Sequence, residues 1–297
     1  MTVNYKQNRG KKNYSIIAFI LLFLAGSAIL FYPKISYWVA EQNHTVAVQD
    51  YNRVVGNLTN DEKKEMWAAA VNYNERLVTS IVMDPFADTD HIDPFDEYYQ
   101  TLDIGNGMMG SIHIPKIDIL IPIYHGVSDE VLDKGIGHIK ATALPVGGLG
   151  THGVLTGHSG LSHAEMFNDL EQLNLGDEFF LNILDETLAY RINEINVVLP
   201  DDISNLQREK DKDKITLITC TPTGINSHRL LVTGERIELD KVETELPLET
   251  KSIFPWWIVA LVIGLLIALL IIGRIVTKSR EKKNRKADTA NAYIDEI

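Results

Sequence analysis

The feature that most restricts the fold of this chain is a series of short apolar segments with a period of two, beginning at Gly110. The segments lie at 111–114, 153–156, 179–183, 188–195, 215–219 and 230–237. Successive side chains of a strand point to opposite faces, so this period indicates β-strands with one buried face. Gly and Pro turns separate the segments, and Leu184-Asp185-Glu186 joins two of them as a tight hairpin. Because the strands do not alternate with helices, we expect an all-β barrel or sandwich.

The segment before the strands is predicted to be helical over residues 35–82. Its best-defined helix begins at Thr59, where Glu62 three positions later completes a capping box. Apolar side chains of this helix share one face, at Met66, Ala70, Tyr73 and Leu77. We expect this face to pack on the β-domain.

Two long apolar stretches near the chain ends, 16–32 and 254–276, each have the length needed to span a bilayer. Basic residues precede the first and follow the second, which is the pattern of cytoplasmic flanks. The first stretch predicts an uncleaved signal anchor; a cleavable signal peptide is the alternative, because small residues lie at 25–28. Two transmembrane helices with both termini in the cytoplasm would place the residues between them outside the cell.

The predicted organisation follows from these stretches and from the strand pattern. It comprises a basic cytoplasmic N-terminus (1–14), a transmembrane anchor (15–32), extracellular helices and a loop (33–109), the β-domain (110–240), a linker (241–253), a transmembrane helix (254–276) and a basic cytoplasmic tail (277–297). The exterior part, about 33–254, holds 36 of the 40 Asp and Glu residues but 17 of the 28 Lys and Arg residues. Such a surface repels phosphate backbones, so no nucleic-acid partner is expected. The acidity indicates either solubility or steering of a substrate.

Cys220 is the single cysteine of the chain, so it cannot form an internal disulfide. It ends the apolar run 215–219 and is followed by Thr221-Pro222, which places the thiol where a strand stops and a loop begins. A rigid strand end is a suitable place for a nucleophile. The alternative is an inert, buried side chain.

A cysteine nucleophile needs a base and a group that stabilises negative charge. His158 lies between Gly157 and Ser159, directly after the strand 153–156, and is the best candidate base. Arg229 lies directly before the strand 230–237. It would reach Cys220 if the strands at 215–219 and 230–237 pair as neighbours. Taken singly, His158 also fits an ordinary turn residue, and Arg229 a surface ion pair.

Together these residues resemble the sortases, cysteine transpeptidases of Gram-positive cells. The run Thr216-Leu217-Ile218-Thr219-Cys220 is similar to the TLxTC signature of that family, and His158 and Arg229 match its catalytic histidine and essential arginine. Further segments resemble its pilus-building class C branch: Ile114-Pro115-Lys116-Ile117, residues 120–126, residues 144–148 and Cys220-Thr221-Pro222. The resemblance implies a closed eight-stranded β-barrel with N-terminal helices, flanked by two transmembrane helices.

The resemblance also implies a reaction and its partners. Cys220 would attack the Thr–Gly carbonyl of an LPxTG-like sorting signal on a secreted pilin or surface protein, while His158 protonates the leaving amine. A lysine amine of the next pilin would then resolve the thioester, with Arg229 holding the substrate and the oxyanion. The membrane bilayer is the other expected partner, and no metal or organic cofactor is expected.

Class C sortases carry a lid with an Asp-Pro-aromatic motif over the thiol, and this chain offers two candidates. Asp84 with Phe86 is favoured for its spacing after the preceding helix, and Asp93 with Phe95 is the alternative. The loop that carries both could also be a plain surface connection. A further departure is Ser159, where many relatives have Arg.

Three other functions are compatible with the sequence. One is a sortase that attaches proteins to peptidoglycan, which differs in the amine that it accepts. Another is a non-catalytic, membrane-tethered β-domain that scaffolds wall proteins, in which Cys220 is only buried. The third is a hydrolytic cysteine protease, which would release free carboxylates even when an acceptor amine is abundant.

Overall fold

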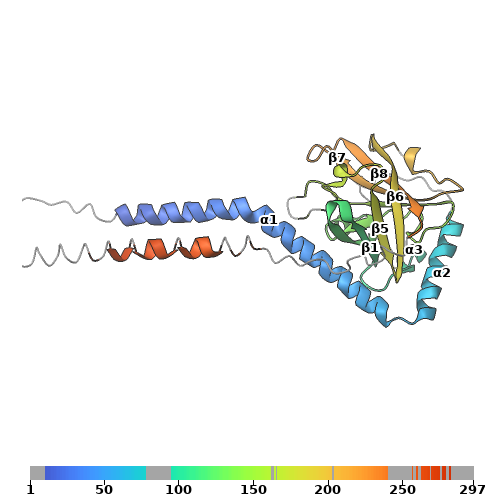
Figure 1. Ribbon diagram of the computed structural model, residues 1–297, viewed down its shortest axis with the longest axis horizontal. Helices are drawn as coiled ribbons and strands as arrows, with labels where there is room; N and C mark the ends of the chain where they lie inside the picture. The colour runs from blue at the N-terminus through green and yellow to red at the C-terminus, as the bar shows by residue number, and fades with distance from the viewer. Residues whose placement is uncertain are drawn as a thin grey trace, which may run out of the picture. The chain divides into compact units, whose positions relative to one another are not determined.

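The computed structural model describes residues 11–77, 95–161, 164, 166–202 and 204–239, and short pieces between 256 and 281. For residues 11–21 and 24 it describes the backbone alone. The chain forms two units, Met1–Leu246 and Pro247–Ile297. The first unit contains all the strands found in the described ranges (Figure 1).

Eight strands of the first unit close into a barrel in the order β1-β2-β3-β4-β7-β8-β6-β5 (Figure 1). Their bounds are β1 Met108–Ile114, β2 Ile119–His125, β3 Ile136–His138, β4 Thr151–Thr156, β5 Glu178–Ile183, β6 Glu186–Val198, β7 Asp213–Thr221 and β8 His228–Ile237. The pairs β2–β3 and β4–β7 are parallel, and the other neighbours are antiparallel. Pairing of β1 with β5 closes the barrel, which confirms the eight-stranded β-barrel prediction.

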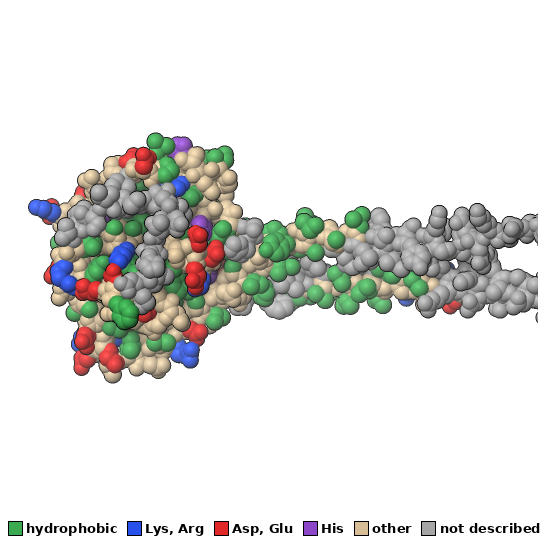
Figure 2. All heavy atoms as spheres, turned by 180° about the vertical axis from the view of Figure 1, so that it is seen from behind, with side chains coloured by type: hydrophobic (Ala, Val, Ile, Leu, Met, Phe, Trp, Pro, Cys, Tyr) green, Lys and Arg blue, Asp and Glu red, His purple; other side chains and the backbone are tan. Residues whose placement is uncertain are grey.

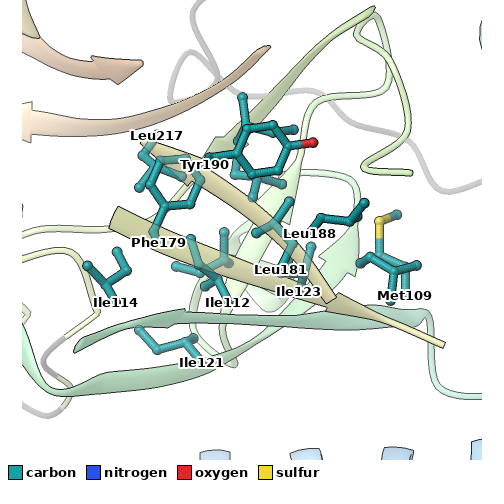
Figure 3. Packing of buried hydrophobic residues seen from close by; sticks show 14 of the residues in the cluster. Met109, Ile112, Ile114, Ile121, Ile123, Phe179, Leu181, Leu188, Tyr190 and Leu217 are labelled. Atoms are coloured by element: carbon teal, nitrogen blue, oxygen red, sulfur yellow. The ribbon is translucent and has the colours of Figure 1, made fainter. Parts of the chain in front are cut away.

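The period of two predicts which side chains fill the barrel. Alternate residues of four strands are buried in one cluster and point toward one another in Figure 3: Ile112 and Ile114, Ile121 and Ile123, Phe179 and Leu181, Leu188 and Tyr190. Each fully buried apolar side chain of this size contributes about 1.5–3 kcal/mol to folding. The intervening side chains lie on the outer face, where some are covered by helices and loops.

Two helices precede the barrel. α1 spans Lys11–Asn57, and its C-terminal half packs against β1 and β2 through buried Val48, Tyr51 and Val55. The Tyr51 hydroxyl donates a hydrogen bond to the Met109 carbonyl oxygen at 2.8 Å. This part of α1 is therefore packed firmly against the barrel.

The second helix, α2, spans Asn60–Arg76 and has Thr59 as its N-cap. Thr59 and Glu62 form the predicted capping box, with the Glu62 amide donating to the Thr59 hydroxyl and the Thr59 amide donating to the Glu62 carboxylate. Ala70 of the predicted apolar face is fully buried against the barrel, with Met66 packed beside it. The helical prediction for 35–82 missed the break at residues 58–59.

The short helix α3, Glu97–Gln100, attaches the chain to the barrel just after the undescribed residues 78–94. Tyr98 is fully buried, and its hydroxyl donates to the His138 carbonyl oxygen at 2.8 Å and accepts from the Gly126 amide at 3.0 Å. At the surface, an ion pair joins Asp96 to Lys140. Residues 96–100 are therefore anchored on the barrel.

The predicted hairpin is present, since β5 and β6 are joined by Leu184 and Asp185 with Ile183 opposite Glu186. Strand β2 was missed because Pro122 lies in its middle, and proline usually argues against a central strand. In the barrel β3 pairs with β2 only over Ile123–His125, so β2 is paired on one side at Pro122. β3 has three residues, too few to show a period.

The prediction of two transmembrane helices is wrong: within the described ranges no helix combines the length and the apolar character needed to cross a membrane. The first apolar stretch belongs to the 47-residue helix α1, whose later part carries polar residues and packs on the barrel. The second stretch is described only in pieces such as 262–267, and the residues between these pieces lie outside the described ranges. The membrane localisation and orientation that rested on these helices are corrected with them.

Acidic side chains are spread over the face of the first unit that Figure 2 shows. Figure 2 shows acidic side chains in several separate groups on one face of the first unit, with basic side chains among them. Some of these charges are paired, as in Arg191 with Glu178 at 2.7 Å. On this face the arrangement favours solubility over a concentrated acidic patch that would steer a substrate.

Candidate active site

Cys220 is the next-to-last residue of β7, the strand that lies between β4 and β8. The strand is paired on both sides over most of its length, so its backbone is held firmly. The Cys220 side chain is 7% exposed. The chain leaves the strand at Thr221, directly before Pro222, so the thiol lies at the end of a rigid element, as the sequence predicts.

Arg229 lies directly opposite Cys220 in the antiparallel pair of β7 and β8. Directly opposite residues of such a pair share one face, with Cβ atoms about 5 Å apart. The Arg229 side chain is 8% exposed, and its Nη1 donates hydrogen bonds to the carbonyl oxygens of Asn226 at 3.0 Å and His228 at 3.1 Å. The two strands therefore pair as neighbours, which is the condition for Arg229 to reach Cys220.

His158 follows β4, the parallel neighbour of β7 on its other side. The last registered pair is Thr156 with Ile218, so His158 and Cys220 each lie two residues further along their strands. The Gly157 amide continues the pairing by donating to the Ile218 carbonyl oxygen at 3.1 Å. His158 is half-buried, and three neighbouring strands thus bring His158, Cys220 and Arg229 to one end of the barrel.

Glycine is required beside the histidine for a steric reason. A Cβ atom added to Gly157 would lie 2.6 Å from Ile136 Cδ1 and 2.9 Å from Phe167 Cδ2. With any larger residue, either these buried side chains or the backbone before His158 would have to shift. The Gly in Thr-Gly-His therefore serves close packing.

Two hydroxyl groups connect the backbones on which His158 and Cys220 lie. The Thr219 hydroxyl donates to the Gly157 carbonyl oxygen at 2.7 Å, and the Ser159 hydroxyl donates to the Cys220 carbonyl oxygen at 2.6 Å. From the sequence, Ser159 is only a departure from relatives, and Thr219 has no function of its own. The signal available in the sequence was a hydroxyl residue directly after the candidate base.

Other histidines are part of the framework of the barrel. His138 is fully buried, its Nε2 lies 2.8 Å from the Ala143 carbonyl oxygen, and burial lowers its pKa to about 3. His152 is buried with Nε2 2.7 Å from the Thr216 hydroxyl, and burial lowers its pKa as well. Both rings stay neutral at pH 7 and serve as hydrogen-bonding core residues.

Three of the four lid candidates, Asp84, Phe86 and Asp93, lie outside the described residues. Phe95 is described and its side chain is 89% exposed. The lid assignment therefore stays a prediction. Within the described residues, no group of three or more His, Cys, Asp or Glu side chains is arranged to hold a metal ion.

Comparison with known proteins identifies the barrel. The family profile described as "Sortase domain" matches residues 112–237, which include His158, Cys220 and Arg229. Among curated proteins, sortase SrtE1 of Streptomyces coelicolor is 33% identical over 141 residues, which are 43% of this chain and 40% of SrtE1. The match thus spans less than half of the length of that relative.

Solved structures of pilus sortases match over most of their own length. Sortase C of Streptococcus pneumoniae, described for its pilin substrate specificity, is 39% identical with a TM-score of 0.61, covering 65% of this chain and 97% of that one. Sortase C-1 of Actinomyces oris is 45% identical with a TM-score of 0.57, covering 60% of this chain and 99% of that one. At these identities the likeness extends beyond the shared fold.

Proposed function

This chain belongs to the sortase family of cysteine transpeptidases, and we propose that it is a class C member that polymerises pilin subunits through Cys220, His158 and Arg229. The catalytic unit comprises about residues 110–240. The observation that carries the proposal is the strand order β4-β7-β8, which supports one shared site for the three residues. The likeness to pilus sortases from streptococci and Actinomyces supports the substrate class.

The first half of the reaction forms a thioester. The Cys220 sulfur attacks the Thr carbonyl carbon of an LPxTG-type signal, and the Thr–Gly bond breaks as His158 gives a proton to the leaving glycine amine. Charge develops on the carbonyl oxygen as the tetrahedral intermediate forms. Arg229, opposite Cys220, is suited to stabilise it with a guanidinium N–H.

The second half transfers the acyl group to an amine. A lysine side chain of the next pilin attacks the thioester carbonyl, His158 accepts the proton from the amine, and the Cys220 thiolate leaves. The product is an isopeptide bond, and the enzyme regains its starting state.

The test is mass spectrometry of the full chain after incubation with an LPxTG peptide, with Cys220→Ala as the matched variant. We expect an adduct with the mass of the peptide up to its threonine, absent in Cys220→Ala. A lysine-bearing pilin peptide should then discharge the adduct as an isopeptide. Discharge only by a peptidoglycan-type amine would contradict pilin polymerisation, and discharge only by water would indicate a protease.

A further inference from the structure

The segment from Gly157 to Leu161, which follows β4, is attached to three separate parts of the chain. The Gly157 amide and the Ser159 hydroxyl join it to β7. The Tyr37 hydroxyl of α1 donates to the Leu161 carbonyl oxygen at 3.0 Å and so joins it to α1. To the turn that follows it is joined by the Phe167 amide, which donates to the His158 carbonyl oxygen at 3.1 Å.

Within this segment the Ser159 hydroxyl bonds a carbonyl of β7 to which a backbone amide would donate if the strand pairing continued. In a parallel ladder, amides at alternate residues of one strand donate to carbonyls at alternate residues of the other. The Gly157 amide donates to Ile218 O, so the next acceptor along β7 is Cys220 O. The Ser159 side chain donates to that acceptor at 2.6 Å, and Ser159 is 9% exposed.

His158 therefore lies between two hydrogen bonds to β7, one from the residue before it and one from the residue after it. The second of these bonds ends on the carbonyl of Cys220 itself. It ties the backbone of the candidate base to the backbone of the candidate nucleophile through one side chain. After Ser159 the chain turns away at Gly160, whose φ is +77°.

We propose that Ser159 is a positioning residue, which acts through His158 by holding it at the distance from Cys220 that proton transfer requires. The proposal rests on the proposed function for the roles of His158 and Cys220. The Ser159 hydroxyl donates to the backbone carbonyl of Cys220, which takes no part in the reaction, and not to its thiol. Its loss would leave the nucleophile in place and let the base move.

The expected effect is on kcat rather than on KM. A displacement of about 1 Å at a catalytic group can cost about 100-fold in rate. We expect Ser159→Ala to lower kcat by about 10- to 100-fold, with KM for an LPxTG peptide little changed. Ser159→Thr keeps a hydroxyl at the same position and should recover most of the lost rate.

Thr151 provides a matched control at the other end of β4. Its hydroxyl donates to the Gly148 carbonyl oxygen at 2.6 Å, and the residue is 8% exposed. Thr151→Ala thus removes a hydroxyl-to-carbonyl bond of the same length, far along the strand from His158. The Thr151 hydroxyl also lies 3.5 Å from Asp213 Oδ1, so the control loses a second, longer contact at that end of the strand. We expect Thr151→Ala to lower the melting temperature as Ser159→Ala does but to leave kcat unchanged.

A double-mutant cycle separates positioning from general stability. Because Ser159 acts through His158, Ser159→Ala should cause no further loss of rate when His158 is already alanine. A structural role would produce the same additional loss in both backgrounds. Equal losses in both backgrounds, or a full-rate Ser159→Ala variant, would overturn the proposal.

Alkylation of Cys220 by iodoacetamide, followed by mass spectrometry from pH 5 to 9, tests the same inference without a peptide substrate. A coupled histidine shapes the pH dependence of a thiol, so Ser159→Ala should shift the profile while Thr151→Ala leaves it as in wild type. If wild type formed no adduct with an LPxTG peptide, the proposed function would fail, yet a shifted profile would still support Ser159 as a positioning residue. Identical profiles in all three proteins would reject it.

Discussion

The two ends of β7 lie in one barrel, yet they hold their polar side chains in different ways. At the first residue, the Asp213 carboxylate accepts hydrogen bonds from the Gly148 amide at 2.8 Å and the Tyr190 hydroxyl at 3.1 Å. Arg236 of β8 lies 3.8 Å from the same carboxylate. The buried charge is thus surrounded by groups of the framework.

At the other end, the bonds that fix the backbone come from neighbours of the proposed catalytic residues. Thr219 donates to Gly157, and Ser159 donates to the carbonyl of Cys220. The thiol of Cys220 is not needed for either bond. These two hydrogen bonds can therefore persist while the thiol and the imidazole exchange a proton or the thiol forms a covalent bond.

One strand thus carries a structural carboxylate at its first residue and the proposed reactive thiol near its last. A buried polar group whose hydrogen-bond capacity is used by the framework is costly to change but chemically inert. A reactive group needs a rigid surrounding that does not depend on the group itself. Four predictions test this division, in order of decreasing effect.

The largest effect is expected for Cys220→Ala. Loss of the nucleophile should lower the transpeptidation rate by at least about 1,000-fold. The free energy of unfolding should fall by only about 1 kcal/mol or less, because one buried sulfur atom is removed. Peptide turnover measures the rate, and denaturant unfolding measures the free energy of unfolding. A large loss of stability would show that the thiol helps to hold the folded structure together.

Two arginines of β8 provide the next contrast, since Arg229 lies opposite Cys220 and Arg236 lies by Asp213. Arg229→Lys should lower kcat/KM by about 100-fold, because an ammonium cannot reproduce the planar donor geometry of a guanidinium. Arg236→Lys should change kcat/KM by less than about threefold, since its ion pair is partly exposed. Equal losses of kcat/KM in the two variants would contradict the view that one end of β7 is catalytic and the other structural.

Asp213→Ala should act on stability alone. It leaves the buried Tyr190 hydroxyl and the part-buried Gly148 amide without their acceptor, which we expect to cost about 2–3 kcal/mol of unfolding free energy. The folded protein should keep its kcat/KM for an LPxTG peptide. A proportionate fall in kcat/KM would mean that the two ends of β7 are coupled.

The smallest effect is a pH dependence of stability. Burial raises the pKa of Asp213 above its ordinary value of 3.8, although the Gly148 amide and Tyr190 partly oppose this. The folded state then binds the proton more readily than the unfolded state. The contribution to stability is therefore fully present below 3.8 and is lost as pH rises through the raised pKa.

The Asp213→Asn variant has no titrating group at this position, so it is the reference for the stability that wild type loses as pH rises. The unfolding free energy of wild type minus that of Asp213→Asn should decrease as pH rises from 4 towards 7. The slope can reach about 1.4 kcal/mol per pH unit for one proton. Denaturant unfolding at several pH values measures this difference, and a constant difference would refute the assigned direction.

Local patterns were predicted well from the sequence because their causes are local. The capping box at Thr59 depends on four consecutive residues, and the β5–β6 hairpin on a two-residue connection. The strand period showed which side chains share a face, and most of the strands lie where it predicts them. The membrane helices were predicted from apolar stretches taken by themselves, whereas within the described ranges no helix has the length and apolar character needed to cross a membrane.

The motifs of the sequence by themselves determined which residues were candidates for the chemistry, namely His158, Cys220 and Arg229. The tertiary structure alone decided that β4 and β7 lie side by side, which brings the Ser159 hydroxyl to the carbonyl of Cys220, 61 residues away. A period of two specifies the buried face of a strand but not its neighbour. That choice depends on how all eight strands bury their apolar faces at once when the barrel closes, and no single segment carries this information.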